Sequence, residues 1–213
     1  WLYKLPNATK KLNRIINRLD AGLRSIDAGN PAYRLLESNI REMEDLVGTF
    51  NSILKISELE AKPDFIELEP CDLGQIIGNL VEFYEPYAAE KNIAFSSAVG
   101  GGSIIAGEKN LLTQAFANLI DNAIKFTPDG GAIAITCERK DGGVTVIIAD
   151  SGPGIPLQYR DKVFEKFFRL EQSRHTKGNG LGLSLVAATA RIHNAQIVLE
   201  DNAPGLKVLI HFT

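Results

Sequence analysis

The chain has 213 residues, of which 45% are hydrophobic and 23% are charged, and its formal net charge is −3. This composition is typical of a soluble globular protein and excludes wholesale disorder, while so mild a charge gives no reason to expect a nucleic acid or an anionic membrane as partner. No apolar run approaches the roughly 20 residues that span a bilayer, so we expect no membrane segment. Cys71 and Cys137 lie far apart without metal-site spacing, which indicates free thiols in a reducing compartment.

The first predicted element is a helix that begins near Leu12. Its apolar residues recur at helical spacing and would bury one face: Leu12, Ile15, Ile16, Leu19, Leu23 and Ile26. Residues 27–31, Asp-Ala-Gly-Asn-Pro, end this helix, because Gly suits a helix C-terminus and Pro suits the first turn of the next helix.

A longer helix is predicted from about Pro31 to Ala61. Its apolar residues form two adjacent stripes, Leu36, Met43, Leu46, Phe50 and Ile53 in one and Ile40, Val47 and Leu54 in the other. A face this wide is typical of a four-helix bundle, of which one hairpin supplies half. We therefore predict a homodimer with twofold symmetry through residues 12–61. The alternative is a hairpin that packs on its own second domain.

The remaining chain alternates strands and helices after a break at residues 62–64, Lys-Pro-Asp. Period-2 and period-3.6 patterns predict strands at 66–69, 93–98, 103–106, 132–138, 144–149, 196–200 and 207–212, and helices at 73–90, 108–125 and 180–192. Asp72 suits the N-cap of the first helix, and residues 140–143, Lys-Asp-Gly-Gly, predict a hairpin. The predicted fold class is α+β, with a helical hairpin at 1–62 and a mixed domain at 63–213.

Three polar residues share one face of the predicted 108–125 helix. Asn118, Asn122 and Lys125 are separated by helical spacing, and the neighbouring positions are apolar. An amide oxygen suits Mg²⁺ and an ammonium suits phosphate, so the face could bind a metal–phosphate group. The alternative is that these side chains cap neighbouring loops or face water.

Two glycine-rich segments follow. Residues 150–154, Asp-Ser-Gly-Pro-Gly, come directly after a strand, where a carboxylate can accept a hydrogen bond from an exocyclic amine. Residues 178–182, Gly-Asn-Gly-Leu-Gly, open a helix whose free N–H groups suit a phosphate. The second segment follows no strand and lacks a P-loop ending, which excludes the Rossmann and P-loop classes. Alone, either segment could be an ordinary turn.

A charged segment, residues 160–177, separates the two glycine segments. Its basic residues and flanking glycines suit a lid that closes over a polyphosphate. The alternative interpretation is that this segment is a solvated loop. Three phenylalanines in this segment, Phe164, Phe167 and Phe168, need an apolar surface to anchor against.

In this order, the motifs resemble the catalytic ATP-binding domain of sensor histidine kinases, in the superfamily shared with gyrase, Hsp90 and MutL. The resemblance implies a Bergerat-type α/β sandwich that binds ATP and Mg²⁺, with Asn122 on the metal and Asp150 on the adenine amine. It implies catalytic roles for Asn118, Lys125 and Arg169. It implies a nucleotide site made of Asn118, Asn122, Lys125, Asp150, Gly152, Gly154, Phe164, Phe168, Lys177, Gly178, Gly180, Leu181 and Gly182.

The same resemblance extends to the hairpin, which is similar to the family's dimerisation and phosphotransfer region. It implies transfer of the ATP γ-phosphoryl to a histidine, relay to an aspartate of a response regulator, and a location in the cytoplasmic portion of a membrane-bound sensor. A Ser/Thr protein kinase of the anti-sigma-factor type shares the ATP domain, but it normally lacks a long helical hairpin such as residues 12–61.

The chain departs from the family pattern at the phospho-accepting histidine, since residues 1–30 contain none. We expect His175, His193 and His211 to be structural or solvated, because none has the surroundings of an acceptor. Three hypotheses account for the departure: the first helix is truncated, the chain is an engineered fragment, or the kinase is degenerate and binds ATP without phosphorylating itself. The other family motifs are intact in this chain, which favours a truncated first helix or an engineered fragment over a degenerate kinase.

Overall fold

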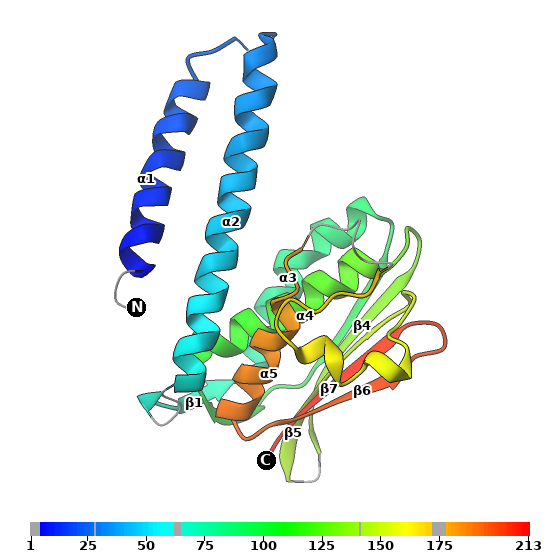
Figure 1. Ribbon diagram of the computed structural model, residues 1–213. Coiled ribbons are helices and arrows are strands. Elements are labelled where there is room, and N and C mark those ends of the chain that lie inside the picture. Colours follow the sequence, from blue (N-terminus) through cyan, green and yellow to red (C-terminus); the bar gives the residue numbers. More distant parts are fainter. Residues whose placement is uncertain (1–4, 28, 62–64, 141, 172–177) are drawn as a thin grey trace. The chain divides into compact units, whose positions relative to one another are not determined.

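The computed structural model describes residues 5–27, 29–61, 65–140, 142–171 and 178–213, and the chain divides into two compact units, residues 1–58 and 59–213 (Figure 1). The predicted break at 62–64 and residue 141 of the predicted hairpin connection lie outside the described residues. None of the helices within the described ranges is long and apolar enough to cross a membrane.

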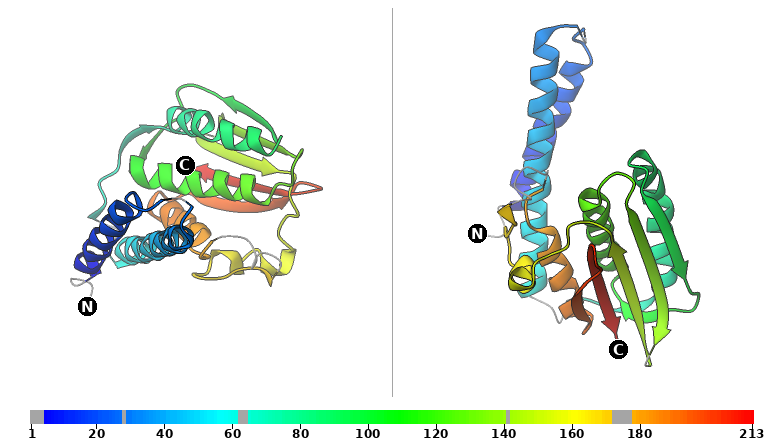
Figure 2. Two further views of the ribbon diagram at one scale, coloured as in Figure 1. Left: turned by 90° about the horizontal axis from the view of Figure 1, so that it is seen from above. Right: turned by 90° about the vertical axis from the view of Figure 1, so that its right-hand side faces the viewer.

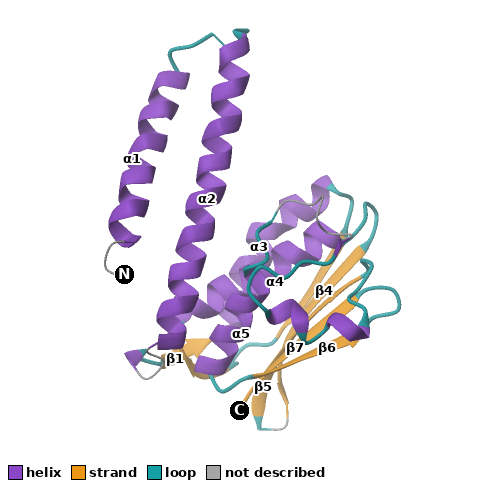
Figure 3. Ribbon diagram, in the orientation of Figure 1, coloured by secondary structure: helices purple, strands orange, loops and turns teal. Residues whose placement is uncertain are grey.

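The first unit is an antiparallel helical hairpin. Helix α1 (Leu5–Leu23) runs back along α2 (Pro31–Ala61), as Figure 3 shows. The turn is fixed by polar contacts, since Gly29 N donates to Asp27 Oδ1 at 3.1 Å and Ala32 N donates to Asn30 Oδ1 at 2.9 Å. The predicted start of α1 at Leu12 was too late, because residues 5–11 have no apolar period to reveal the helix.

The hairpin buries only part of its apolar surface. Its core consists of Ile16, Leu23, Ile40 and Val47, with Leu12, Leu19, Tyr33, Leu36 and Met43 packed partly against it. Three further apolar side chains from the predicted stripes stay exposed, Ile15 at 45%, Leu46 at 55% and Phe50 at 41%. The apolar face is therefore wider than a single hairpin covers.

The second unit is built on a five-stranded sheet. Its strands are β2 (Ala94–Val99), β4 (Ala132–Lys140), β5 (Gly143–Asp150), β7 (Leu206–Phe212) and β6 (Gln196–Asp201), in that spatial order. The β2–β4 pair is parallel and the other pairs are antiparallel. The register sets Ile133 opposite Asp150 and therefore brings the end of β5 to the start of β4.

A separate two-stranded ribbon pairs β1 (Glu69–Asp72) with β3 (Ile104–Gly107). The predicted strand at 66–69 was wrong, because β1 begins at Glu69. Pairing with β3 turns Cys71 inward, where its Sγ donates to the Gly107 carbonyl oxygen at 3.1 Å. This long-range partner fixes the strand, and the local alternation of residues 66–69 does not reveal it.

Three helices cover one face of the sheet and complete the predicted α/β sandwich: α3 (Leu73–Glu90), α4 (Lys109–Phe126) and α5 (Gly182–Ile192) (Figure 2). Asp72 caps α3 as predicted, accepting from Gly74 N at 2.9 Å. The helices and the sheet share one apolar core that includes Leu73, Ile77, Phe116, Ile120, Ile135 and Val146. Two short 3₁₀ turns, η3 (Leu157–Tyr159) and η4 (Lys162–Phe164), follow β5.

Candidate active site

The polar face of α4 points toward the start of α5. Asn118 Nδ2 donates to the Gln114 carbonyl oxygen at 2.9 Å, and a Cβ added to Gly182 would lie 2.9 Å from Asn118 Oδ1. Asn122 is half-buried one turn further on, and its side chain makes no hydrogen bond with any residue that the structure describes. One amide is thus held against α5, and the next keeps its oxygen available for a ligand.

Two cationic side chains converge on Gly178. A Cβ added to this glycine would lie 2.8 Å from Lys125 Nζ, and Arg169 Nη1 donates to its carbonyl oxygen at 2.6 Å. Burial lowers the pKa of Lys125, the nearby charge of Arg169 lowers it further, and Asp121 acts in the opposite direction. Two cationic side chains therefore lie beside the glycine segment, where they could bind an anion.

The second glycine segment packs tightly where it meets the phenylalanines. Gly180 has φ +71°, and a Cβ there would lie 2.9 Å from the Phe168 carbonyl oxygen. Phe167 N donates to the Gly180 carbonyl oxygen at 3.0 Å. Leu181 follows as a buried residue at the N-cap of α5, with its own N–H directed to Asn179 Oδ1 at 3.2 Å. A side chain at position 180 would push these segments apart, so glycine is required there.

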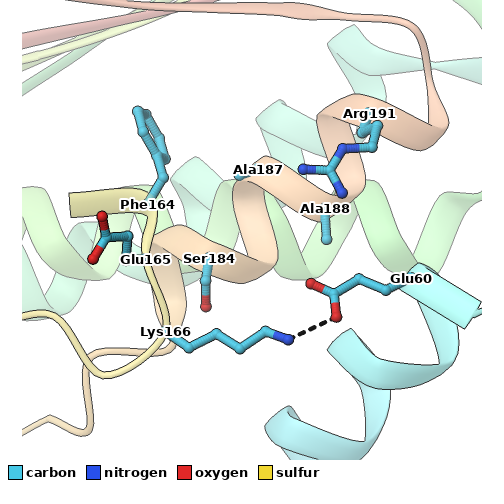
Figure 4. Close-up of a pocket in the computed structure, with 8 residues that line it drawn as sticks. All are labelled: Glu60, Phe164, Glu165, Lys166, Ser184, Ala187, Ala188 and Arg191. Carbon is cyan, nitrogen blue, oxygen red and sulfur yellow. Dashed lines mark hydrogen bonds and ion pairs between the residues drawn. The ribbon is translucent and has the colours of Figure 1, made fainter. Parts of the chain in front are cut away.

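The three phenylalanines have different surroundings. Phe168 packs on Tyr159 with ring centroids 5.9 Å apart, whereas Phe167 is 57% exposed. Phe164 lines a pocket of about 280 Å³ beside α5, together with Glu60, Glu165, Lys166, Ser184, Ala187, Ala188 and Arg191 (Figure 4). Lys166 Nζ and Glu60 Oε2 form an ion pair of 2.6 Å at its edge. Neither the α4 polar face nor Asp150 lines this pocket.

Asp150 ends β5 and is only 7% exposed. Its Oδ1 accepts from Gly152 N at 2.8 Å and from Leu206 N at 3.3 Å, while neither bond uses Oδ2. Burial raises the pKa of Asp150, and these two hydrogen bonds counteract the rise. The carboxylate is therefore oriented by the backbone, with one oxygen left to accept from a ligand.

The first glycine segment wraps closely around Asp150. A Cβ added to Gly152 would lie 2.9 Å from both Asp150 Oδ1 and the Phe126 carbonyl oxygen. Gly154 has φ +69° and adjoins Gly205 of the β6–β7 connection. Gly152 therefore packs between the last residue of α4 and Asp150 at the end of β5. This packing brings the predicted amide face and the predicted carboxylate into one region.

Sequence reasoning missed the residues behind Asp150. Asn202 Nδ2 donates to the Asp150 carbonyl oxygen at 2.8 Å, and Gly205 packs so tightly on that oxygen that a Cβ would overlap it. Both belong to the β6–β7 turn, some fifty residues along the chain. Its Asn-Ala-Pro-Gly sequence signals a turn but does not say what the turn packs against.

The predicted structural roles of two histidines are confirmed. His193 Nε2 accepts from Glu108 N at 2.9 Å, and its Nδ1 lies 2.7 Å from the Thr189 carbonyl oxygen. His211 Nδ1 lies 2.9 Å from Thr145 Oγ1. His175 and the predicted site residue Lys177 lie outside the described residues.

The sequence of residues 107–213 matches the family model for the histidine kinase-, DNA gyrase B-, and HSP90-like ATPases. This stretch contains all of the predicted nucleotide-site residues, and it covers half of the chain. The chain therefore belongs to this ATPase family, which implies ATP as the ligand of the site.

Within this family, the chain is similar to sensor histidine kinases. It is 30% identical over 188 residues to the sensor-like histidine kinase SenX3 of Mycolicibacterium smegmatis, covering 87% of this chain and 49% of that protein. It is 33% identical over 184 residues to the sensor protein CreC of Escherichia coli, covering 84% and 38%. The chain thus spans half or less of the length of these relatives.

Solved structures show the same likeness. The mycobacterial sensor histidine kinase MprB superimposes with a TM-score of 0.61 at 31% identity, covering 69% of this chain and 97% of that one. Full-length ShkA superimposes with a TM-score of 0.79 at 23% identity, covering 99% of this chain and 45% of that one. The second likeness concerns the fold, and it extends over both units.

Proposed function

We propose that the chain is the kinase core of a two-component sensor histidine kinase, which binds ATP with Mg²⁺ and transfers the γ-phosphoryl group to a histidine. The observation that carries the proposal is the arrangement of charge: one oriented carboxylate at Asp150, two converging cations at Lys125 and Arg169, and the α4 amides in the same region. This arrangement suits a ligand with an amine donor at one end and an anionic chain at the other.

At the adenine end, Asp150 would accept a hydrogen bond from the exocyclic amine through Oδ2. Gly152 and Gly154 would let the backbone lie close to the ring. A buried carboxylate discriminates strongly, because a base without a donor at that place would leave its charge without a partner. Asp150 would therefore select adenine over bases that present a carbonyl there.

At the phosphate end, Lys125 and Arg169 would neutralise the polyphosphate, and the glycine segment 178–182 at the start of α5 would bind it. Phe164, Phe168 and Lys177 belong to the segment that we propose closes over the nucleotide. Transfer of a phosphoryl group requires little covalent chemistry from the protein, so Asn118, Lys125 and Arg169 would act by positioning and charge neutralisation.

Asn122 is the residue that would hold Mg²⁺. Its amide has no protein partner among the described residues, and an amide oxygen is a hard ligand of the type that Mg²⁺ prefers. Within the same ranges, no group of three His, Cys, Asp or Glu side chains is placed to hold a metal. A single amide with phosphate oxygens and water matches the sparse protein ligation usual for Mg²⁺, which supplies charge neutralisation at the phosphates when bound.

Residues 1–62 would form the dimerisation and phosphotransfer hairpin, and residues 63–213 the catalytic domain. The exposed Ile15, Leu46 and Phe50 support a homodimer through residues 12–61, because a second hairpin would cover them. The relay partner would be a response regulator, and the whole protein a membrane-bound sensor with this portion in the cytoplasm.

Calorimetry with ATP tests the site. Asp150→Asn should weaken binding about 10- to 100-fold, because a charge-assisted hydrogen bond is lost, and Asn122→Ala should weaken it only when Mg²⁺ is present. Glu138→Gln is a control, since Glu138 is an exposed strand carboxylate at the far end of β4 from the residue paired with Asp150. Unchanged affinity in both site variants would remove the assignment.

The missing acceptor favours a second candidate, a degenerate kinase that binds ATP and acts on a partner or by conformation. Labelled ATP should leave no acid-labile label on the isolated chain, because residues 1–30 contain no histidine. Label on an added histidine-containing kinase dimer would support a competent catalytic domain. Binding without transfer to any such dimer would support the degenerate kinase, and acid-labile label on the chain itself would contradict the absence of an acceptor.

A further inference from the structure

A lysine outside every predicted motif holds the end of α4. Lys91 follows α3 directly, and its Nζ donates to the carbonyl oxygens of Ile124 at 2.8 Å and Thr127 at 2.6 Å, with that of Lys125 at 3.5 Å. The Lys91 carbonyl oxygen in turn accepts from Gly130 N at 3.0 Å. One residue therefore contacts both the last turn of α4 and the loop that leaves it.

These carbonyl groups need such a donor. The last four carbonyls of a helix have no partner within it, and they carry the negative end of the helix dipole. In α4 the cap supplies one bond, from Thr127 N to the Ala123 carbonyl oxygen at 2.9 Å. Lys125 lies in the same turn, but its ammonium points to Gly178 instead. Lys91 provides the cation that this helix end otherwise lacks.

The same turn adjoins both halves of the candidate site. On one side it carries Asn122 and Lys125. On the other, the Phe126 carbonyl oxygen packs against Gly152, which donates its N–H to Asp150. A shift of residues 124–127 would therefore move the Lys125 cation, disturb the adjoining turn that carries Asn122, and change the packing around the carboxylate.

We infer that Lys91 is a positioning residue for nucleotide binding, which acts by fixing the C-terminal turn of α4 against Gly152. Among the residues that the structure describes, the Lys91 ammonium donates to backbone oxygens alone, so it acts through other residues and not on the nucleotide itself. This inference rests on the proposed ATP site. Because the turn adjoins the proposed adenine end as well as the proposed phosphate end, Lys91 should influence the binding of both the adenine and the phosphate part of ATP.

The test compares Lys91→Met, which removes the ammonium at similar length, with Lys91→Arg, which keeps a cationic donor. Lys109→Met is a matched control, because Lys109 is an exposed residue at the opposite end of the same helix. Calorimetry at a temperature where circular dichroism shows every variant folded should give K91M about tenfold weaker affinity for ATP and for adenosine. K91R should recover most of this loss, and K109M should bind like the unmodified chain.

A second measurement separates the inference from the proposed function. In the nucleotide-free protein, K91M should shift the NMR signals of the Asn122 side-chain amide and the Gly152 backbone N–H, while K109M should leave both in place. If K91M does not fold, Lys91→Gln gives the same comparison. Failure of the unmodified chain to bind ATP would overturn the proposed function. Unmoved signals in K91M, or wild-type affinity, would overturn the role of Lys91.

Discussion

The two ends of the candidate site are stabilised in different ways. At the proposed adenine end, Asp150 is 7% exposed and takes part in four hydrogen-bonding or packing contacts from Gly152, Asn202, Gly205 and Leu206. At the proposed phosphate end, Lys125 and Arg169 are only half-buried and converge on the exposed Gly178. The first end is part of the folded core, whereas the second presents two like charges at the surface.

The ends share one electrostatic feature. Burial raises the pKa of Asp150 and lowers the pKa of Lys125, so folding disfavours the charged form of both groups. A ligand with an amine donor at one end and phosphates at the other would stabilise both charges. The proposed ligand would offset this unfavourable effect of burial, as is usual for functional residues with shifted pKa values.

The largest predicted effect comes from a steric clash behind Asp150, at the proposed adenine end. Gly205→Ala places a Cβ against the Asp150 carbonyl oxygen at a residue with φ +122°. We expect the free energy of unfolding to fall by about 3 kcal/mol, since overpacking and backbone strain act together. Urea denaturation measures this loss.

Gly142→Ala is the control for backbone strain alone. Gly142 also has a positive φ, +84°, but no atom lies near its added Cβ. It should cost only about 1 kcal/mol. Equal losses in the two variants would show that tight packing behind Asp150 contributes nothing.

The second prediction separates the two ends by ligand. Lys125→Met should weaken ATP binding about 10- to 30-fold, because a charge-assisted contact to phosphate is lost, yet leave adenosine binding unchanged. Asp150→Asn should weaken ATP and adenosine by the same factor. Calorimetry with both ligands measures the four affinities. A loss of adenosine affinity in K125M would mean that the ends do not act separately.

Much of this architecture follows from local sequence. The bounds of α2 follow from Pro31 and its apolar stripes, and those of α3 from the Asp72 cap, because caps and periodicity act over a few residues. The amide face and both glycine segments were recognised from their spacing and from the order in which they occur. Those signals also require no knowledge of distant partners.

The supporting contacts could not be predicted in this way. Lys91 reaches carbonyls 33 to 36 residues away, and Asn202 reaches Asp150 across 52 residues. Each side chain is an ordinary surface type at its own position, and backbone carbonyls carry no sequence signal. Only the packing of α3 on α4, and of β7 on β5, creates these bonds, so residues that hold the site are harder to find than residues that line it.

The smallest predicted effect concerns pH and sharpens the contrast between the ends. Because burial and Arg169 lower the pKa of Lys125, the folded chain loses this proton at a lower pH than the unfolded chain, whose lysine keeps its ordinary pKa of about 10.4. Between these pKa values the unfolded state binds more protons, so the Lys125 contribution to stability increases as pH rises.

The affinity for phosphate changes with pH in the opposite direction, since phosphate binding requires the Lys125 ammonium and is coupled to proton uptake. ATP affinity should therefore fall a few-fold as the pH rises toward the ordinary lysine pKa of about 10.4, while adenosine affinity stays level. K125M should lose the slope for ATP, and a slope that persists in K125M would assign the titration to another group.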